Sequence, residues 1–190
     1  WNELRGIPSI EWEYEPNDKK NICTSRSFGK LTNDYSIIKE AASNYAASCA
    51  EKLRRQASVC KSVHVFISTN PHKTDHQQFQ HSITIQCETA TNLTNEIIAY
   101  ALQGLEIIFA AGNFLFMKCG VMVLNIIPEN EVQMNMFNQK SRAKEKIVLQ
   151  LGKGTVRMAV QRFDKRYRLK AEHLSRKYTT RLDEVLKIKI

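Results

Sequence analysis

Few residues in this chain have the types and spacing that catalysis or metal binding requires. His72 and His76 lie four positions apart, which would place two metal ligands on one helix face, but Pro71 and its polar neighbours predict a loop instead. The GKGT sequence at 152–155 resembles part of a phosphate-binding loop, but the first glycine of that motif is missing. The acidic residues are scattered, and no Cys-x-x-Cys pair occurs. We therefore predict no catalytic residue, no metal site and no cofactor in this chain.

A different kind of candidate lies in the stretch EVQMNMFNQK, residues 131–140. Gln133, Met136 and Phe137 have no helical or strand periodicity around them that would bury them in a core. Apolar side chains in a polar connector are typical of a peptide that binds a pocket of another protein. Each of the two apolar side chains would contribute about 1.5–3 kcal/mol when fully buried. The alternative is that Met136 and Phe137 fold back onto the rest of this chain.

The charge of the chain is concentrated at its C-terminal end. Residues 1–139 hold 12 Lys and Arg against 14 Asp and Glu, a net charge of −2. Residues 140–190 hold 16 against 5, a net charge of +11. A basic extension on a nearly neutral body favours a polyanionic partner, most often nucleic acid, whereas the alternative is a solvated, highly charged end.

The cysteines and the apolar runs indicate the kind of compartment. Five cysteines occur at irregular spacing, and three of them lie in apolar runs, which is typical of reduced, buried thiols in a cytoplasmic protein. No apolar run approaches the roughly 18 residues of a membrane span. No signal peptide is present, and we expect an excised piece of a longer protein because the chain begins with Trp1.

The hydrophobic pattern predicts an α+β domain with the order β-α-β-β-α-β over residues 19–128. Strands are expected at 20–28, 62–69, 79–87 and 114–127, and helices at about 34–56 and 91–109. Asn33 or Asp34 would cap the first helix, and Gly112 would end the second. Ile97, Ala101, Leu105 and Ile108 form the inward stripe of that second helix.

This order predicts four antiparallel strands with both helices on one face of the sheet. The other face stays open and would carry Ser25 or Arg26, His81 and Lys118.

Residues 1–18 resemble a linker, and 129–139 form a second linker. The basic extension, 140–190, is expected to begin with an amphipathic helix at 140–154 and a short strand at 155–160.

Two kinds of nucleic-acid-binding module share this order of elements. One is a nucleic-acid-binding module that also carries a peptide motif for a partner protein. The other is an RNA-recognition module, which stacks bases on exposed aromatic residues of its central strands. The two central strands here offer only Phe66 for such stacking, so the sequence disfavours the second kind.

Several segments, in one order, resemble the little-finger domain of a Y-family DNA polymerase. They are ICTSRSFGKLTNDY, NYAASCAEKLRRQ, VFISTNP, EIIAYALQGLEIIF, KCGVMVLNIIP, GKGTVRMA and LSRKYTTRLDEVLKIK. The upstream ELRGIPSIEWE resembles the connector from the thumb domain, which would assign residues 1–18 to that connector. The resemblance covers essentially the whole chain.

The resemblance implies error-prone DNA synthesis past lesions, in the SOS response, by a longer parent protein. Its catalytic carboxylates and Mg²⁺ ions belong to a palm domain that this chain lacks, so this part alone is expected to be inactive. The contribution implied for this chain is to bind template-primer DNA through the phosphates. The candidate contacts are Thr24, Ser25, Arg26, Ser27 and Lys118, then Ser82 and Thr84, with Lys30 a weaker choice. Strand geometry is expected to point both Arg26 and Lys118 at the open face.

The resemblance also implies protein partners. Family members carry a sliding-clamp-binding motif of the form Q-x-x-[L/M]-F after the little finger, and Gln133, Met134, Met136 and Phe137 would be the clamp-binding residues here. A dimer of the processed UmuD protein and the RecA filament are partners of family members that have such a basic extension. The rival function is a free-standing, clamp-associated DNA-binding or regulatory protein without polymerase activity.

Overall fold

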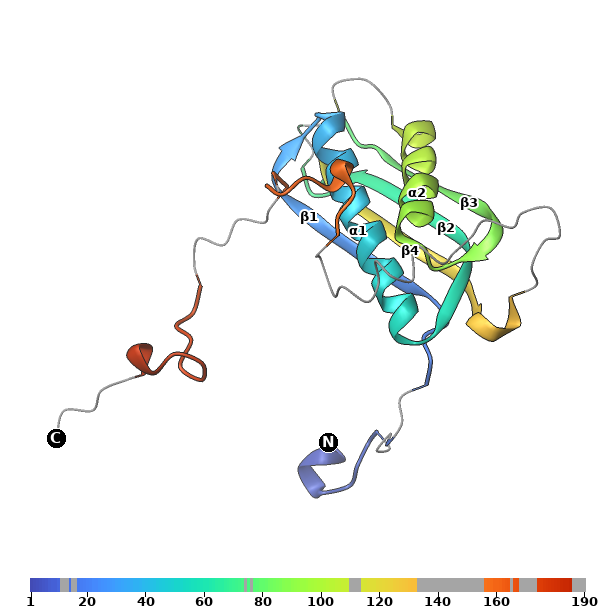
Figure 1. Cartoon of the computed structure of the whole chain (residues 1–190). Helices are drawn as coiled ribbons and strands as arrows, with labels where there is room; N and C mark the ends of the chain where they lie inside the picture. The colour runs from blue at the N-terminus through green and yellow to red at the C-terminus, as the bar shows by residue number, and fades with distance from the viewer. Residues whose placement is uncertain are drawn as a thin grey trace.

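A computed structural model describes residues 1–10, 14, 17–73, 75, 77–109, 114–132, 156–164, 166–167 and 174–185. The body contains β1 (Ile22–Thr32), α1 (Tyr35–Arg55), β2 (Ser58–Thr69), β3 (Gln80–Thr91), α2 (Thr94–Ile108) and β4 (Phe116–Pro128). Short 3-10 helices are η1 (Glu3–Arg5), η2 (Glu129–Glu131), η3 (Ala159–Gln161) and η4 (Leu182–Glu184). The predicted α+β class and β-α-β-β-α-β order are confirmed (Figure 1).

The four strands form one antiparallel sheet in the order β1-β4-β2-β3, so the first and last strands are neighbours. Both helices pack on the same face, with α1 over β1 and β4 and α2 over β2 and β3 (Figure 1). Antiparallel partners point their side chains to the same side of a sheet. The register therefore assigns every strand residue to either the helix-covered face or the open face.

Local sequence explains where the helices begin and which side they bury. The Asp34 side chain accepts a 2.7 Å hydrogen bond from the Ser36 amide and so caps α1, as predicted. Hydrogen bonding from the Ser36 hydroxyl, together with that from its amide, lowers the pKa of the Asp34 carboxyl. Small and apolar residues at helical spacing, including Ala42, Ala46 and Cys49, are fully buried along α1. The predicted inward stripe of α2 is also confirmed, because all four of its members are buried.

The core lies between the helices and the covered face of the sheet. Val63, Val65 and Ile67 of β2 pair with Val123, Val121 and Cys119 of β4, and all six are fully buried. An aromatic cluster closes one end of this core. Its centre is Phe116, 1% exposed, whose ring centroid lies 5.7 Å from those of Phe79 and Phe109 and 6.3 Å from that of Phe114.

The structure corrects several expected boundaries. The GK pair at 29–30 does not end the first strand, which continues to Thr32 through an irregularity in register after Ser27. The second helix ends at Ile108, with Phe109 extended, while Gly112 lies outside the described residues. The prediction of a strand at 155–160 is wrong, because the described part of that segment, 156–160, is not a strand and leads into η3. The helix expected at 140–154 lies outside the described residues.

Part of the C-terminal extension lies against α1. We call residues 156–164, 166 and 167 the docked segment. Its η3 contacts α1, and Tyr167 is buried in the main core cluster (Figure 1). No helix among the described residues is long and apolar enough to cross a membrane.

Candidate nucleic-acid interface

The open face of the sheet is a four-strand surface that no helix covers. Its members alternate with the buried core residues of each strand. They are Cys23, Ser25 and Ser27 of β1; Lys118, Gly120, Met122 and Leu124 of β4; Ser62, His64, Phe66 and Ser68 of β2; and Gln80, Ser82, Thr84 and Gln86 of β3. Most members are hydroxyl, amide or other small side chains. Such a surface can donate hydrogen bonds to anionic oxygens at many points.

Phe66 lies at the centre of the open face and determines its shape. A Cβ built on Gly120 would come within 2.2 Å of Phe66 Cζ and 2.6 Å of Ser25 Cβ. The ring therefore occupies the space that a side chain at position 120 would need, and glycine is required there for this close approach. The Lys118 ammonium lies 5.8 Å from the ring centroid, within reach of a cation–π interaction.

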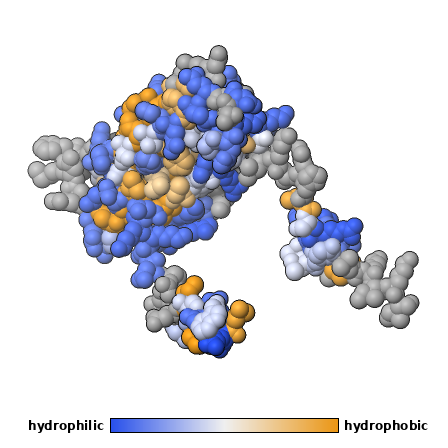
Figure 2. All heavy atoms as spheres, turned by 180° about the vertical axis from the view of Figure 1, so that it is seen from behind, coloured by the Kyte–Doolittle hydropathy of each residue, from blue (hydrophilic) through white to orange (hydrophobic). Residues whose placement is uncertain are grey.

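The neighbouring positions combine polar and apolar groups. His64 Nδ1 lies 2.9 Å from Thr84 Oγ1, so these two side chains are hydrogen-bonded across β2 and β3. Met122 and Leu124 are half-buried in the same face. Figure 2 shows this side of the molecule, where hydrophobic residues form a central area bordered by hydrophilic ones. Among the described members of the open face, Lys118 is the only Lys or Arg.

The structure places five of the predicted contact residues on the open face. These are Ser25, Ser27, Lys118, Ser82 and Thr84. Lys118 lies directly opposite Ser27 on β1 and Ser68 on β2, so it is next to hydroxyl groups from two neighbouring strands.

Arg26, Thr24 and His81 lie on the other side of the sheet. Arg26 pairs with the buried Cys119, so the prediction that Arg26 and Lys118 share the open face is wrong. Thr24 Oγ1 accepts a 3.1 Å hydrogen bond from Lys52 Nζ of α1, and His81 pairs with the buried Ile67. All three belong to edge strands, so Arg26 and His81 are exposed beside the helices. Lys30 is exposed near the end of β1.

The predicted clamp-binding residues, Gln133, Met134, Met136 and Phe137, lie outside the described residues. Within the described part of the chain, no three His, Cys, Asp or Glu side chains are grouped so that they could hold a metal ion.

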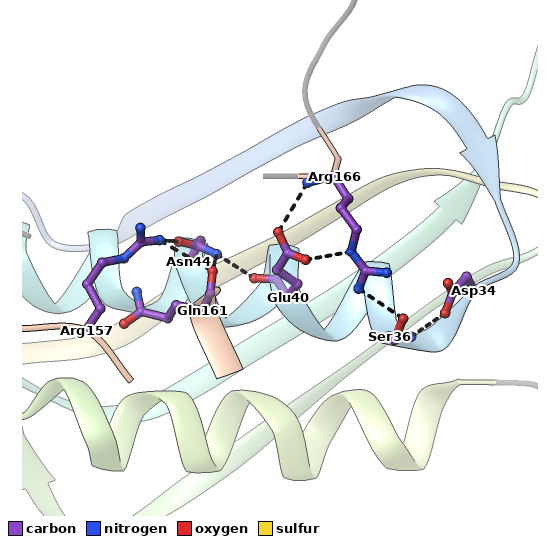
Figure 3. A network of polar contacts seen from close by, with 7 residues as sticks. All are labelled: Asp34, Ser36, Glu40, Asn44, Arg157, Gln161 and Arg166. Atoms are coloured by element: carbon purple, nitrogen blue, oxygen red, sulfur yellow. Dashed lines mark hydrogen bonds and ion pairs between the residues drawn. The ribbon is translucent and has the colours of Figure 1, made fainter. Parts of the chain in front are cut away.

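Sequence reasoning missed a polar network that attaches the docked segment to α1 (Figure 3). Glu40 is 1% exposed, and its Oε2 lies 3.1 Å from Arg166 Nε while its Oε1 accepts a 3.3 Å bond from the Arg166 amide. Arg166 also donates to Ser36 Oγ at 3.1 Å. This arrangement neutralises a carboxylate that would otherwise be buried without a partner.

A second group of bonds lies about one turn further along α1 in the same network. The Asn44 side chain donates to the Gln161 carbonyl at 2.9 Å and accepts from Arg157 at 2.9 Å. Tyr167 packs edge-on against Tyr45, with ring centroids 5.6 Å apart. The burial of polar residues on the helix, such as Glu40 and Ser43, shows in the structure that something covers α1. The local sequence contains no such signal.

The geometry defines an α+β module with one helix-covered face, one open polar face and a basic segment attached to α1. The sequence matches two family descriptions: impB/mucB/samB family C-terminal domain over residues 19–136, and Domain of unknown function (DUF4113) over residues 142–188. The chain belongs to the impB/mucB/samB family and corresponds to the C-terminal domain of its members.

Individual relatives agree with this assignment. Protein UmuC of Salmonella typhimurium is 32% identical over 196 residues, a match that covers 98% of this chain and 46% of UmuC. Protein MucB of Escherichia coli is 31% identical over 186 residues, covering 94% of this chain and 44% of MucB. The chain thus spans a little under half the length of these relatives. The predicted resemblance to the C-terminal part of UmuC, within the Y family, is confirmed.

Proposed function

We propose that the open face binds the phosphate backbone of template-primer DNA, without sequence specificity, as part of an error-prone translesion polymerase. The observation that carries the proposal is the open face itself, which both helices leave uncovered and on which Lys118 lies between the hydroxyl side chains of Ser27 and Ser68. Phosphate contacts position a protein on DNA but carry no sequence information, which suits an enzyme that must pass damaged bases.

The test is a titration of the 190-residue chain with labelled duplex DNA at several salt concentrations. We expect Lys118→Ala to weaken binding and to reduce the slope of log affinity against log salt by about 0.9, the value for one lost phosphate contact. Lys39→Ala on α1 is the matched control and should leave the slope unchanged. Binding that is absent or independent of salt would contradict the proposal.

The Arg26→Ala variant tests whether the duplex binds the open face or the edge of the sheet at β1. Because Arg26 lies on the helix side of β1, binding through the open face predicts a smaller loss for Arg26→Ala than for Lys118→Ala. The reverse order would place the duplex along the β1 edge, and Thr24 and Arg26 would then be the main contacts from this strand.

We also propose that Gln133, Met136 and Phe137 bind the β sliding clamp. Support comes from the Q-x-x-M-F spacing at 133–137, at the end of the region that matches the family's C-terminal domain, 19–136. The Met136→Ala/Phe137→Ala variant is expected to lose clamp binding in a pull-down or calorimetric titration while its melting temperature stays unchanged. Retained binding with a lower melting temperature would show instead that the two side chains pack on this chain.

The remaining partners follow from family membership. We propose that processed UmuD and the RecA filament bind the whole protein, to which SOS mutagenesis and polymerase activity also belong. The C-terminal extension is the candidate region for these two partners because it is the basic part of the chain.

A further inference from the structure

The docked segment carries a hollow whose lining residues have no role in the function proposed above. Its volume is about 430 Å³, and it lies on the α1 side of the body, away from the open face. The lining residues are Arg157, Met158, Ala159, Arg162, Phe163, Asp164 and Arg166.

Phe163 is the unusual member of this group. Its side chain is 83% exposed and is absent from the core cluster, although a phenylalanine ring gains free energy by leaving water. The Arg157 guanidinium carbon lies 5.5 Å from the ring centroid. Arg157 is itself held by Asn44 and by the Gln161 carbonyl, so the cation beside the ring is fixed to α1.

Arg162 supplies a second cation to the lining of the same hollow. Its φ of 45° lies in the left-handed region that non-glycine residues seldom adopt, and its amide donates to the Ala159 carbonyl at 3.2 Å. Its side chain is exposed and makes no ion pair with another described residue. A strained backbone that presents an unpaired cation is a feature that often accompanies a binding function.

The charges of the hollow favour an anion with a flat, apolar part. Arg166 is neutralised by Glu40, which leaves Arg157 and Arg162 against Asp164. Two cations against one acid attract phosphate only modestly, so an exposed ring is needed to add affinity. Aromatic rings beside cationic side chains are the usual platform for unpaired bases, because every base can stack and every linkage carries a phosphate.

We propose that this hollow binds single-stranded nucleic acid, with a base stacked on Phe163 and the adjacent phosphates at Arg157 and Arg162. The site is independent of the duplex surface, since all of its lining residues belong to the docked segment and none to the open face. A strand held here would lie on the opposite side of the body from a duplex bound at Lys118.

The experiment measures fluorescence anisotropy of labelled oligothymidylate and oligouridylate with the 190-residue chain. Phe163→Ala is expected to weaken binding of single strands about ten-fold, the order of one base–aromatic stack, and Phe163→Trp should retain it. Arg162→Ala should lower the slope of log affinity against log salt by about 0.7, the value for one phosphate of a single strand. Comparing the two oligonucleotides shows whether DNA or RNA is preferred.

Two substitutions in the same extension serve as matched controls. Tyr178→Ala removes another exposed aromatic residue, and Arg181→Ala removes an arginine that is already paired with Asp183 and Glu184. Both should leave single-strand affinity unchanged, and the melting temperatures of all variants should match because Phe163 is exposed.

Three results would overturn the proposal. One is unchanged single-strand affinity in Phe163→Ala. Another is an equal loss of affinity for duplex, which would mean that the hollow does not select unpaired bases. The third is a Phe163→Leu variant with unchanged single-strand affinity, found together with wild-type binding of polyglutamate as tight as that of the oligonucleotides. That pair of results would identify an acidic peptide as the ligand instead.

Discussion

An Arg166→Ala variant is expected to release the docked segment from α1. Glu40 is 1% exposed, and the substitution removes the guanidinium that pairs with its carboxylate. Removing one partner of a buried pair commonly costs 3–5 kcal/mol, and the 36% exposure of Arg166 favours the low end, about 3 kcal/mol. The docking equilibrium would then shift by roughly a hundred-fold. Because the body can keep its fold while the segment leaves, the loss should appear as undocking rather than as global unfolding.

Hydrogen exchange and limited trypsin digestion measure this effect. Released chains should be cleaved faster at Arg157 and Arg162, while the amides of β2 and β4 should keep their protection. Glu40→Leu/Arg166→Leu is the informative partner variant, since replacing both charges by apolar groups is often neutral or stabilising. Equal cleavage rates for the wild type and Arg166→Ala would show that the pair does not hold the segment.

Phe116→Ala is expected to lower the free energy of unfolding by about 3–5 kcal/mol, the usual range for truncating a buried phenylalanine. Phe116 is 1% exposed and lies against the rings of Phe79, Phe109 and Phe114. Phe79 precedes β3 and Phe109 follows α2, while Phe114 lies two residues before Phe116. Those side chains are fixed by different elements and cannot all move to fill the space, so a cavity should remain.

Denaturant titration followed by circular dichroism gives the free energy and its slope. The slope should be unchanged if the native and unfolded states keep their exposed areas. Phe114→Ala is a control at the half-buried edge of the same cluster and should cost clearly less. A loss below about 1 kcal/mol for Phe116→Ala would mean that the cluster collapses around the missing ring.

The helices and the order of elements could be predicted because their signals are local. Helical spacing of apolar residues and one short polar cap determine α1, and both are visible within about twenty residues. The ends were less predictable. A Gly-Lys pair commonly marks a turn, but β1 continues through it because Thr32 pairs with Phe116 of β4 and Phe28 is buried in the core.

Predicting which face of the sheet an edge-strand residue occupies required the positions of the apolar residues as well as those of the polar ones. In β1 both sets of alternate residues are largely polar, so polarity alone did not determine which set faces outward. The apolar residues did contain that information: Ile22 and Phe28 are buried, and Arg26 has the same parity as both. His81 likewise has the parity of Ile83 and Ile85 in β3, which pair with buried residues of β2.

The docked segment could not be predicted from local sequence. Its contacts join Glu40 to Arg166 and Asn44 to Gln161, pairs more than a hundred positions apart. A basic, weakly periodic extension gives no indication of where it binds. Only the buried acid on α1 reveals the contact, and burial is known only once the fold is known.

The strand order has a consequence for how the chain acquires its surface during synthesis. β1 pairs with β4, the last strand of the body, so the four-stranded sheet is incomplete until the chain has been made through Pro128, although β2 and β3 can pair earlier. Such long-range pairing raises contact order and slows folding. Ser25, Ser27 and Lys118 come from these first and last strands. A nascent body therefore lacks the assembled surface, and completion of the fold coincides with the appearance of the proposed DNA contacts.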